Sequence, residues 1–247
     1  YNPFSVLKAL SNREIAPYWF ATGTPTFLVN RIKARGTYPP DINGQKCTKN
    51  ELLSVGITDS NPLPIMFQTG YLTIDSYNDE MEMYALRFPN REVEIGFYQD
   101  LLPVYAPPTA DPDSPFSLTK FKEDLYEGRP DDFMNRIETL LKNLPGEDQS
   151  ESVYRAVTFL LATLSSTRSI AEHHGYKGRS DLEIITGDNI YLMEFKYNKS
   201  VEKAMEQIHA RDYAGRYSLD SRTVYIIGVN FENNKGKRIM TYQIEKL

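Results

Sequence analysis

The sequence contains little cysteine and no long apolar run, and both absences narrow the possible functions. Cys47 is the single cysteine among 247 residues, which excludes an intrachain disulfide and a metal site built from several thiolates. A lone thiol is typical of a reducing compartment, so we expect a cytoplasmic protein. No apolar stretch approaches the roughly 20 residues that a membrane-spanning helix needs, so we expect no membrane partner.

An excess of positive charge is also missing. The chain carries 28 basic and 33 acidic residues, a net charge of -5, which argues against a surface that attracts nucleic acid everywhere. Any contact with nucleic acid must then come from a local cleft, whose field can differ in sign from the net charge. The hydrophobic content of 40% and the charged content of 25% are those of a globular protein.

A proline-rich stretch divides the chain. Four prolines lie within 106–116, where they oppose both helix and central strand, so we predict an extended linker there. For 1–105 we predict a mainly helical domain with a β-hairpin. We predict three helices: one at 2–10, one that begins at Thr24-Pro25 and has Phe27, Leu28 and Ile32 on one face, and one at 91–105 that Asn90 caps. The two strands of the hairpin are predicted at 65–74 and 81–88.

The region 117–247 begins with helical periodicity and then changes to strand-like patterns. This order predicts an α/β (α+β) fold with a mixed sheet. The run 223–229 is apolar throughout, which is typical of a central, buried strand. The predicted elements are helices at 117–127, 131–144, 150–165 and 200–217, and strands at 181–186, 190–197, 223–229 and 239–244.

The predicted hairpin of this region brings ionisable side chains together. With a two-residue type II′ turn on Gly187-Asp188, counting outward places Asp181 opposite Glu194. Facing residues of an antiparallel pair lie on one side of the sheet, and Lys196 shares that side because it is two residues past Glu194. Two carboxylates and an ammonium group should therefore converge, whereas a three-residue turn would separate them.

Two neighbouring carboxylates repel each other unless a cation lies between them. Mg²⁺ (or Mn²⁺) would remove this conflict, because such an ion prefers hard oxygen ligands and keeps several waters. Lys196 would then orient or deprotonate an attacking water, or stabilise charge on a phosphoryl group. The alternative is a surface hairpin in which Glu194 and Lys196 form a simple ion pair.

Asp181 followed by Glu194-x-Lys196 resembles the core motif of the PD-(D/E)XK nuclease superfamily. The resemblance implies a restriction-endonuclease-like fold, metal binding by Asp181 and Glu194, and a hydrolytic water assisted by Lys196. Ser180 stands where the motif has proline, a departure that removes no metal ligand.

The resemblance also implies site residues outside the hairpin. Members often carry a glutamate on the first core helix, for which Glu151 is the matching candidate and Glu172 the second choice. Gln207 and Tyr213 resemble positions that several members place beside the site. The adjacent His173-His174 cannot both face one ion in a regular strand or helix, and we expect them in a loop near the site.

A wider resemblance covers nearly the whole chain. Residues 1–5, 18–25 and 68–72 resemble the lid end of a predicted AAA-ATPase-like family, in which an NTPase region precedes a PD-(D/E)XK domain. Because no Gly-x-x-x-x-Gly-Lys-Ser/Thr loop occurs, no nucleotide site is expected in this chain. The chain opens on Tyr1, and we expect an upstream NTPase region of the same polypeptide as a partner.

Two functions of different classes follow from these patterns. The first is metal-dependent hydrolysis of phosphodiester bonds in nucleic acid, with DNA as the expected substrate, in a protein whose upstream NTPase core is missing from this chain. The second is a catalytically inactive nuclease-like module that binds to or regulates an NTPase, which the lack of net positive charge favours.

Overall fold

The computed structural model divides the chain into two compact units, Tyr1–Val104 and Tyr105–Leu247. The division falls beside the predicted linker, of which 107–113 and 115 lie outside the described residues. No helix that the structure describes is both long enough and apolar enough to cross a membrane. The described residues are 3–13, 26–54, 61–106, 114, 116–143, 151–166, 168–174, 179–234 and 237–247.

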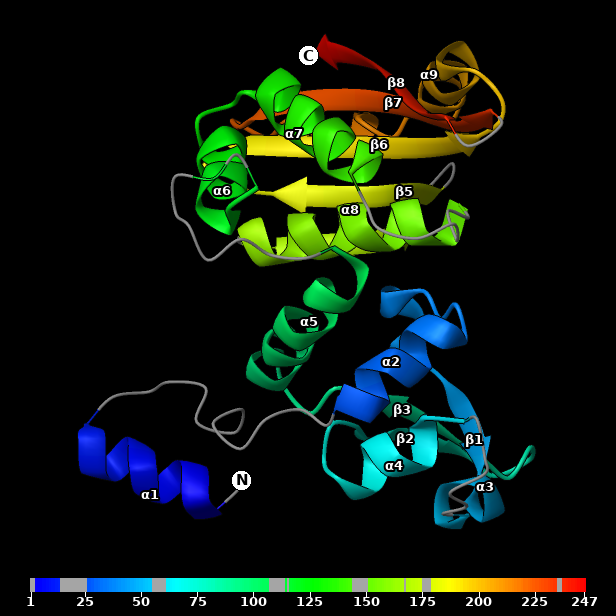
Figure 1. Cartoon of the computed structure of the whole chain (residues 1–247). Helices are drawn as coiled ribbons and strands as arrows, with labels where there is room; N and C mark the ends of the chain where they lie inside the picture. The colour runs from blue at the N-terminus through cyan, green and yellow to red at the C-terminus, as the bar shows by residue number, and fades with distance from the viewer. Residues whose placement is uncertain are drawn as a thin grey trace. The chain divides into compact units, whose positions relative to one another are not determined.

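The N-terminal unit combines short helices with a small antiparallel sheet of strand order β1-β3-β2 (Figure 1). Asn90 caps its last helix as predicted, because the Asn90 Oδ1 atom accepts a hydrogen bond of 2.9 Å from the Val93 amide. The elements are α1 (Pro3–Asn12), α2 (Thr26–Ala34), η2 (Pro39–Ile42), β1 (Lys46–Thr48), α3 (Lys49–Leu53), α4 (Leu63–Gln68), β2 (Thr73–Asn78), β3 (Met83–Arg87) and α5 (Arg91–Tyr105).

The helix at 91–105 is confirmed in this unit, and a β-hairpin is present, but its first strand spans Thr73–Asn78 and not the predicted 65–74. Two further predictions are wrong. Residues 65–68 belong to helix α4 and not to a strand, because prolines at the start favour a first helical turn and a short apolar run fits either structure. Phe27 is 53% exposed, and Val29 is buried beside Leu28 and Ile32 in its place. The segments 1–2 and 18–25 of the wider resemblance lie outside the described residues.

The C-terminal unit is a layered structure in which α6, α7 and α8 cover one face of the larger sheet and α9 covers the other (Figure 1). The strand order is β4-β5-β6-β7-β8, with β6 and β7 parallel and the other neighbours antiparallel, so the predicted mixed sheet is confirmed. The elements are α6 (Leu118–Tyr126), α7 (Pro130–Lys142), α8 (Glu151–Ser165), β4 (Arg168–His174), β5 (Arg179–Ile185), β6 (Asn189–Tyr197), α9 (Val201–Ala210), η3 (Gly215–Tyr217), β7 (Thr223–Asn234) and β8 (Lys237–Lys246).

Two elements of this unit differ from the prediction. Strand β4 was not predicted, because its sequence is rich in charged and histidine residues and lacks apolar alternation; it is an edge strand, where such residues are tolerated. Helix α9 ends at Ala210 and not at Tyr217, since Asp212 adopts a left-handed conformation with a φ of 49° and the chain continues as turns and η3.

A fully buried aspartate joins two helices on one face of the sheet. Asp124 of α6 is 0% exposed and accepts from Arg136 Nε of α7 at 2.5 Å and from Arg129 Nη2 at 3.1 Å. A buried carboxylate is stable only with such partners. This ion pair therefore links α6 to α7.

Replacing Asp124 with asparagine should destabilise the protein, because the buried carboxylate that both arginines contact is then no longer charged. We expect a loss of about 3 kcal/mol in the free energy of unfolding, measured by urea denaturation. Glu127→Gln is the matched control: it removes a more exposed ion pair to the same Arg129, at 3.0 Å, and should cost less than about 1 kcal/mol. Equal costs for the two variants would contradict the role given to Asp124.

Candidate active site

The hairpin of β5 and β6 has the predicted register. The Thr186 amide donates to the Asn189 carbonyl oxygen at 2.9 Å, and the strand pairing runs outward to Leu182 opposite Met193. Gly187 does not have the positive φ of a type II′ turn, so the predicted turn type is wrong. The Thr186 hydroxyl instead accepts from the Asn189 amide at 3.2 Å. Loop length sets the register, so the change of turn type leaves the placement of side chains unaltered.

Asp181 lies one residue beyond the last backbone pair of this hairpin. Its Oδ2 atom accepts a hydrogen bond of 2.8 Å from the Phe195 amide, so its side chain takes the place of a backbone partner. Its Oδ1 atom lies 3.8 Å from Arg155 Nη2 of α8. The Asp181 carboxylate is thereby held close enough to Glu194 for its negative charge to raise the pKa of the Glu194 carboxyl.

Glu194 belongs to a closed ring of hydrogen bonds. Lys196 Nζ donates to Glu194 Oε1 at 2.5 Å and to Gln207 Oε1 at 2.9 Å. Gln207 Nε2 donates to the Tyr213 hydroxyl at 3.1 Å, and that hydroxyl donates to Glu194 Oε2 at 3.1 Å. Each of the four side chains therefore fixes the position of two others.

The electrostatics of the ring are dominated by burial. Glu194 is 2% exposed, and burial together with the charge of Asp181 raises the pKa of its carboxyl, while Lys196 and Tyr213 act in the opposite direction. Burial raises the pKa of Tyr213 to about 12, so its hydroxyl is a neutral donor at physiological pH. Burial and the charge of Asp181 thus destabilise the ionised form of Glu194, and a cation bound beside Asp181 would stabilise it.

Helix α9 is placed so that Gln207 reaches this ring. The Asn230 side chain of β7 accepts from the Lys199 amide at 3.1 Å, and the Ser200 hydroxyl then caps the helix. Gly228 pairs with Glu194 in the parallel register, and a Cβ atom there would lie 2.8 Å from the Met205 sulfur of α9. The absence of a side chain at Gly228 therefore lets the helix approach the sheet beside Glu194.

The structure brings four of the predicted site residues together: Asp181, Glu194, Lys196 and Gln207. Glu151 opens α8 one helical turn before Arg155, but its side chain lies outside the described part of the chain. Glu172 and His173-His174 are residues of strand β4, so the expected loop position of the histidines is wrong. Their side chains also lie outside the described part.

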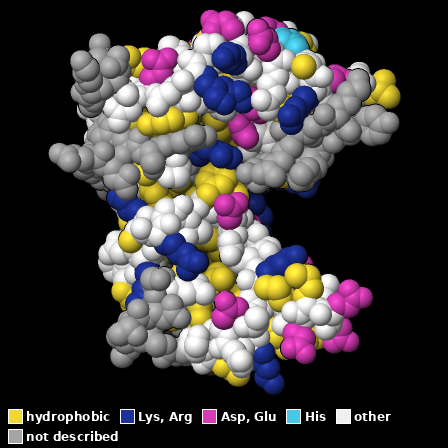
Figure 2. All heavy atoms as spheres, turned by 90° about the vertical axis from the view of Figure 1, so that its right-hand side faces the viewer, with side chains coloured by type: hydrophobic (Ala, Val, Ile, Leu, Met, Phe, Trp, Pro, Cys, Tyr) yellow, Lys and Arg dark blue, Asp and Glu magenta, His cyan; other side chains and the backbone are white. Residues whose placement is uncertain are grey.

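Sequence reasoning missed Arg155. The signal was present, since Arg155 is a single charge within the otherwise apolar stretch 153–157, but its closeness to Asp181 depends on how α8 packs on the sheet. On the face of the C-terminal unit that Figure 2 shows, Lys and Arg side chains lie among Asp and Glu side chains. The positive charge next to Asp181 and Glu194 comes from single side chains, Arg155 and Lys196, and not from a continuous basic surface on that face.

The donor set of the site fits a hard divalent cation. Among the described residues, no three His, Cys, Asp or Glu side chains lie close enough to hold an ion between them, which is unlike a structural zinc site. Mg²⁺ is commonly held by one or two carboxylates and keeps several waters, so a pair of carboxylates such as Asp181 and Glu194 would suit it.

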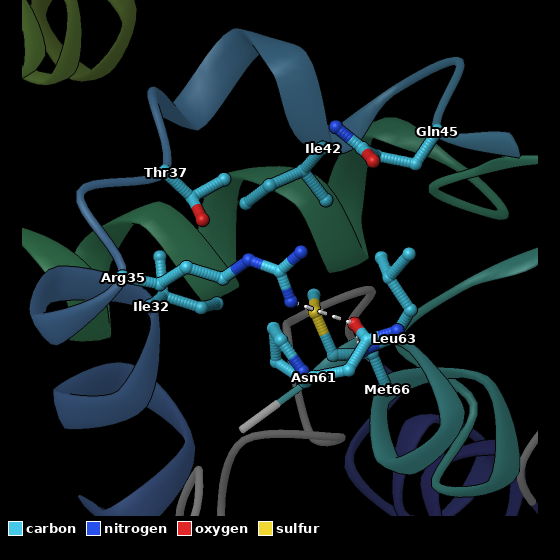
Figure 3. Close-up of a pocket in the computed structure, with 9 residues that line it drawn as sticks. Ile32, Arg35, Thr37, Ile42, Gln45, Asn61, Leu63 and Met66 are labelled. Carbon is cyan, nitrogen blue, oxygen red and sulfur yellow. Dashed lines mark hydrogen bonds between the residues drawn. The ribbon is translucent and has the colours of Figure 1, made fainter. Parts of the chain in front are cut away.

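A cavity of about 60 Å³ lies elsewhere, in the N-terminal unit (Figure 3). Its wall is largely apolar, and Arg35 Nη1 donates to Asn61 Oδ1 there at 3.2 Å. The volume suits a few water molecules, and no acidic, histidine or cysteine side chain is among the described residues that line it. These are Ile32, Arg35, Thr37, Ile42, Gln45, Asn61, Pro62, Leu63 and Met66.

Known proteins provide two similarities. An "Uncharacterized protein in vnfD 5'region" of Azotobacter chroococcum mcd 1 is 28% identical over 262 aligned positions, which cover 100% of this chain and 49% of the relative. The chain thus spans about half the length of the curated relative that it matches. Residues 149–241, which contain all five predicted site residues, match the family described as "PD-(D/E)XK nuclease superfamily". This segment of the chain is therefore a PD-(D/E)XK nuclease superfamily domain.

Proposed function

We propose that the C-terminal unit hydrolyses phosphodiester bonds of nucleic acid, with DNA as the expected substrate, and that it needs a divalent metal ion. The observation that carries the proposal is the meeting of Asp181, Glu194 and Lys196 at one point of a PD-(D/E)XK nuclease superfamily domain. A buried carboxylate next to a second carboxylate lowers the stability of the folded protein when no cation is bound. The arrangement is explained when both carboxylates serve a bound cation.

In this proposal Asp181 and Glu194 hold Mg²⁺ or Mn²⁺. Such an ion polarises a phosphoryl oxygen and makes a nearby water more acidic. Lys196 uses two of its three N–H donors on Glu194 and Gln207, and the third would orient the attacking water or contact the phosphate. Gln207 positions the Lys196 ammonium group through its amide oxygen, and Glu151 is assigned a supporting role from the sequence resemblance.

A second candidate function is a catalytically inactive binding or regulatory module. One observation favours it: both Glu194 oxygens already accept hydrogen bonds, from Lys196 and Tyr213, so the protein satisfies this buried carboxylate with its own donors. In that case the ring of hydrogen bonds would be a structural element of the fold.

The decisive experiment compares cleavage of single- and double-stranded DNA and RNA by the purified protein in Mg²⁺, Mn²⁺ and EDTA. We expect metal-dependent cleavage that falls by about a thousandfold or more in both variants, because Asp181→Asn removes a proposed metal ligand and Lys196→Met removes the group proposed to orient the water or contact the phosphate. Glu202→Gln, an exposed change in the first turn of α9, serves as the control and should retain activity.

Cleavage that persists in both variants would show that a contaminating nuclease is responsible and would refute the assignment. Absence of cleavage, combined with no metal-dependent rise in the melting temperature, would favour the inactive module. A ligand that binds only the folded state at a hundred times its Kd stabilises by about 2.7 kcal/mol, so a bound ion is measurable in this way.

Tyr213→Phe tests whether the ring positions the metal-binding carboxylate. The change removes the hydroxyl that donates to Glu194 Oε2 but keeps the buried aromatic ring. We expect Mn²⁺ affinity to fall by about ten- to a hundredfold, as for other residues that orient a metal ligand, with a small effect on unfolding. Calorimetric titration with Mn²⁺ measures this, and unaltered affinity would mean that Glu194 does not depend on Tyr213.

The role of the N-terminal unit is proposed from the sequence resemblance. We infer that residues 1–105 are the lid-like end of an AAA-ATPase-like region, and that an upstream NTPase region is a partner within a longer polypeptide. In support, the curated relative is about twice the length of this chain. ATP hydrolysis by the longer polypeptide, but not by this chain, is the expected result, and hydrolysis by neither would contradict the inference.

A further inference from the structure

The charged residues of α9 alternate in sign along the sequence, but they separate into two rows on the helix. Residues four positions apart lie on the same side of a helix, so Lys203, Gln207 and Arg211 form one row. Glu202 and Glu206 form the other row, roughly 120° away around the helix axis. The Arg211 amide donates to the Gln207 carbonyl oxygen at 3.1 Å, so the helical spacing continues as far as Arg211.

The two rows face different parts of the C-terminal unit. Gln207 Oε1 accepts from Lys196 Nζ at 2.9 Å, so the basic row lies beside the hydrogen-bonded ring of Glu194. His209 lies on the side of the acidic row, and its Nε2 atom is 3.0 Å from Glu245 Oε2 of β8. The helix therefore turns its basic row toward the candidate active site and its acidic row toward β8.

We infer that Lys203 and Arg211 contact the phosphate backbone of the substrate nucleic acid, on the two sides of the phosphodiester bond that is to be cleaved. The inference rests on the proposed function, because it takes the position of that bond from Asp181, Glu194 and Lys196. It assigns a substrate-docking surface outside the ring, and it gives the two side chains a role in binding and no chemical step.

The spacing of the two cations suits a nucleic-acid strand. Lys203 and Arg211 are both exposed, so an extended anion can reach them. The eight residues that separate them span about 12 Å along the helix axis at about 1.5 Å per residue. One strand of a duplex carries a phosphate about every 3.4 Å along its axis, so this length corresponds to about three phosphates. A strand that follows the row would have its middle phosphate near Lys196, which Gln207 holds between the two outer cations.

Electrostatic effects on neighbouring groups agree with this placement. Burial raises the pKa of Tyr213 to about 12, and the positive charge of Arg211 acts in the opposite direction, so Arg211 is close enough to influence the ring. Glu202 of the other row is engaged at the start of α9, where hydrogen bonds from its own backbone amide and from Ser200 lower the pKa of its carboxyl. A negative charge at that position stabilises the helix terminus. The basic row therefore acts on the site, while the acidic row serves the helix itself.

The experiment measures binding of fluorescently labelled DNA and RNA to the purified protein and to the double variant Lys203→Gln/Arg211→Gln. Fluorescence anisotropy is recorded at several NaCl concentrations with Ca²⁺ held constant, and a gel verifies that the nucleic acid stays intact. We expect the double variant to bind at least about tenfold more weakly at low salt, because charge-assisted hydrogen bonds are lost. The slope of log K against log salt concentration should decrease by about 1.8 for a duplex or by about 1.4 for a single strand, which corresponds to two phosphate contacts.

Each single variant should show about half of that change in slope. Lys122→Gln is the matched control, because it removes one exposed positive charge from α6, on the opposite face of the sheet (Figure 1). It should keep the wild-type affinity and slope. A loss in Lys122→Gln equal to that in the single variants would show that net charge governs binding, and this result overturns the inference.

The inference is also overturned by a double variant with the wild-type slope, or by a wild-type protein that binds neither DNA nor RNA. Calorimetric titration with Mn²⁺ in the absence of nucleic acid tests for a general structural role, because neither residue is assigned to the ion. The Mn²⁺ affinity of the double variant should not fall, and a fall in both affinities contradicts a role in docking alone. A wild-type protein that binds nucleic acid as expected but cleaves none would instead refute the proposed hydrolysis.

Discussion

The burial of a charged carboxylate is the constraint on which the C-terminal unit depends. Glu194 is 2% exposed and lies beside a second carboxylate, so the surrounding structure has to supply compensating donors. Lys196 and Tyr213 supply them directly, and Gln207 holds both of these side chains in place. A strand, a helix and the turn after that helix are thus tied to one acidic group, whose position is correspondingly well defined.

The sheet provides the rigid frame for this arrangement. β6 lies between β5 and β7, so the backbone near Glu194 has partners on both sides. On one side the Asp181 carboxylate accepts from the Phe195 amide, and on the other side Glu194 pairs with Gly228 of the parallel strand β7. Because Gly228 has no side chain, α9 packs against the sheet at the level of Glu194 and presents Gln207 to Lys196. The same packing contact that stabilises the helix layer therefore determines the geometry of the polar ring.

Local sequence patterns were sufficient for the hairpin and not for what surrounds it. The alternation of side chains and a short turn predicted the register that places Asp181 and Glu194 on one side of the sheet. The turn is not of the expected type, but the register is still correct because strand pairing depends on loop length more than on turn conformation. Strand β4 escaped prediction because an edge strand needs no apolar pattern. The Asp181 contacts with the Phe195 amide and with Arg155 join residues 14 and 26 positions apart, and only the assembled layers bring them together.

An acidic protein can still present a positive site to nucleic acid if its negative charges are already neutralised. Glu183 and Asp124, both buried, are each paired with arginine, so these two negative charges have little effect on an approaching phosphate. Among the described residues, Asp181, Glu194, Lys196 and Arg155 lie closest to the site, so their charges act there over distances shorter than the screening length of about 8 Å at physiological salt. The net charge of -5 therefore limits the non-specific attraction of nucleic acid to the protein surface, and the proposed binding at Asp181 and Glu194 would depend on the local field instead.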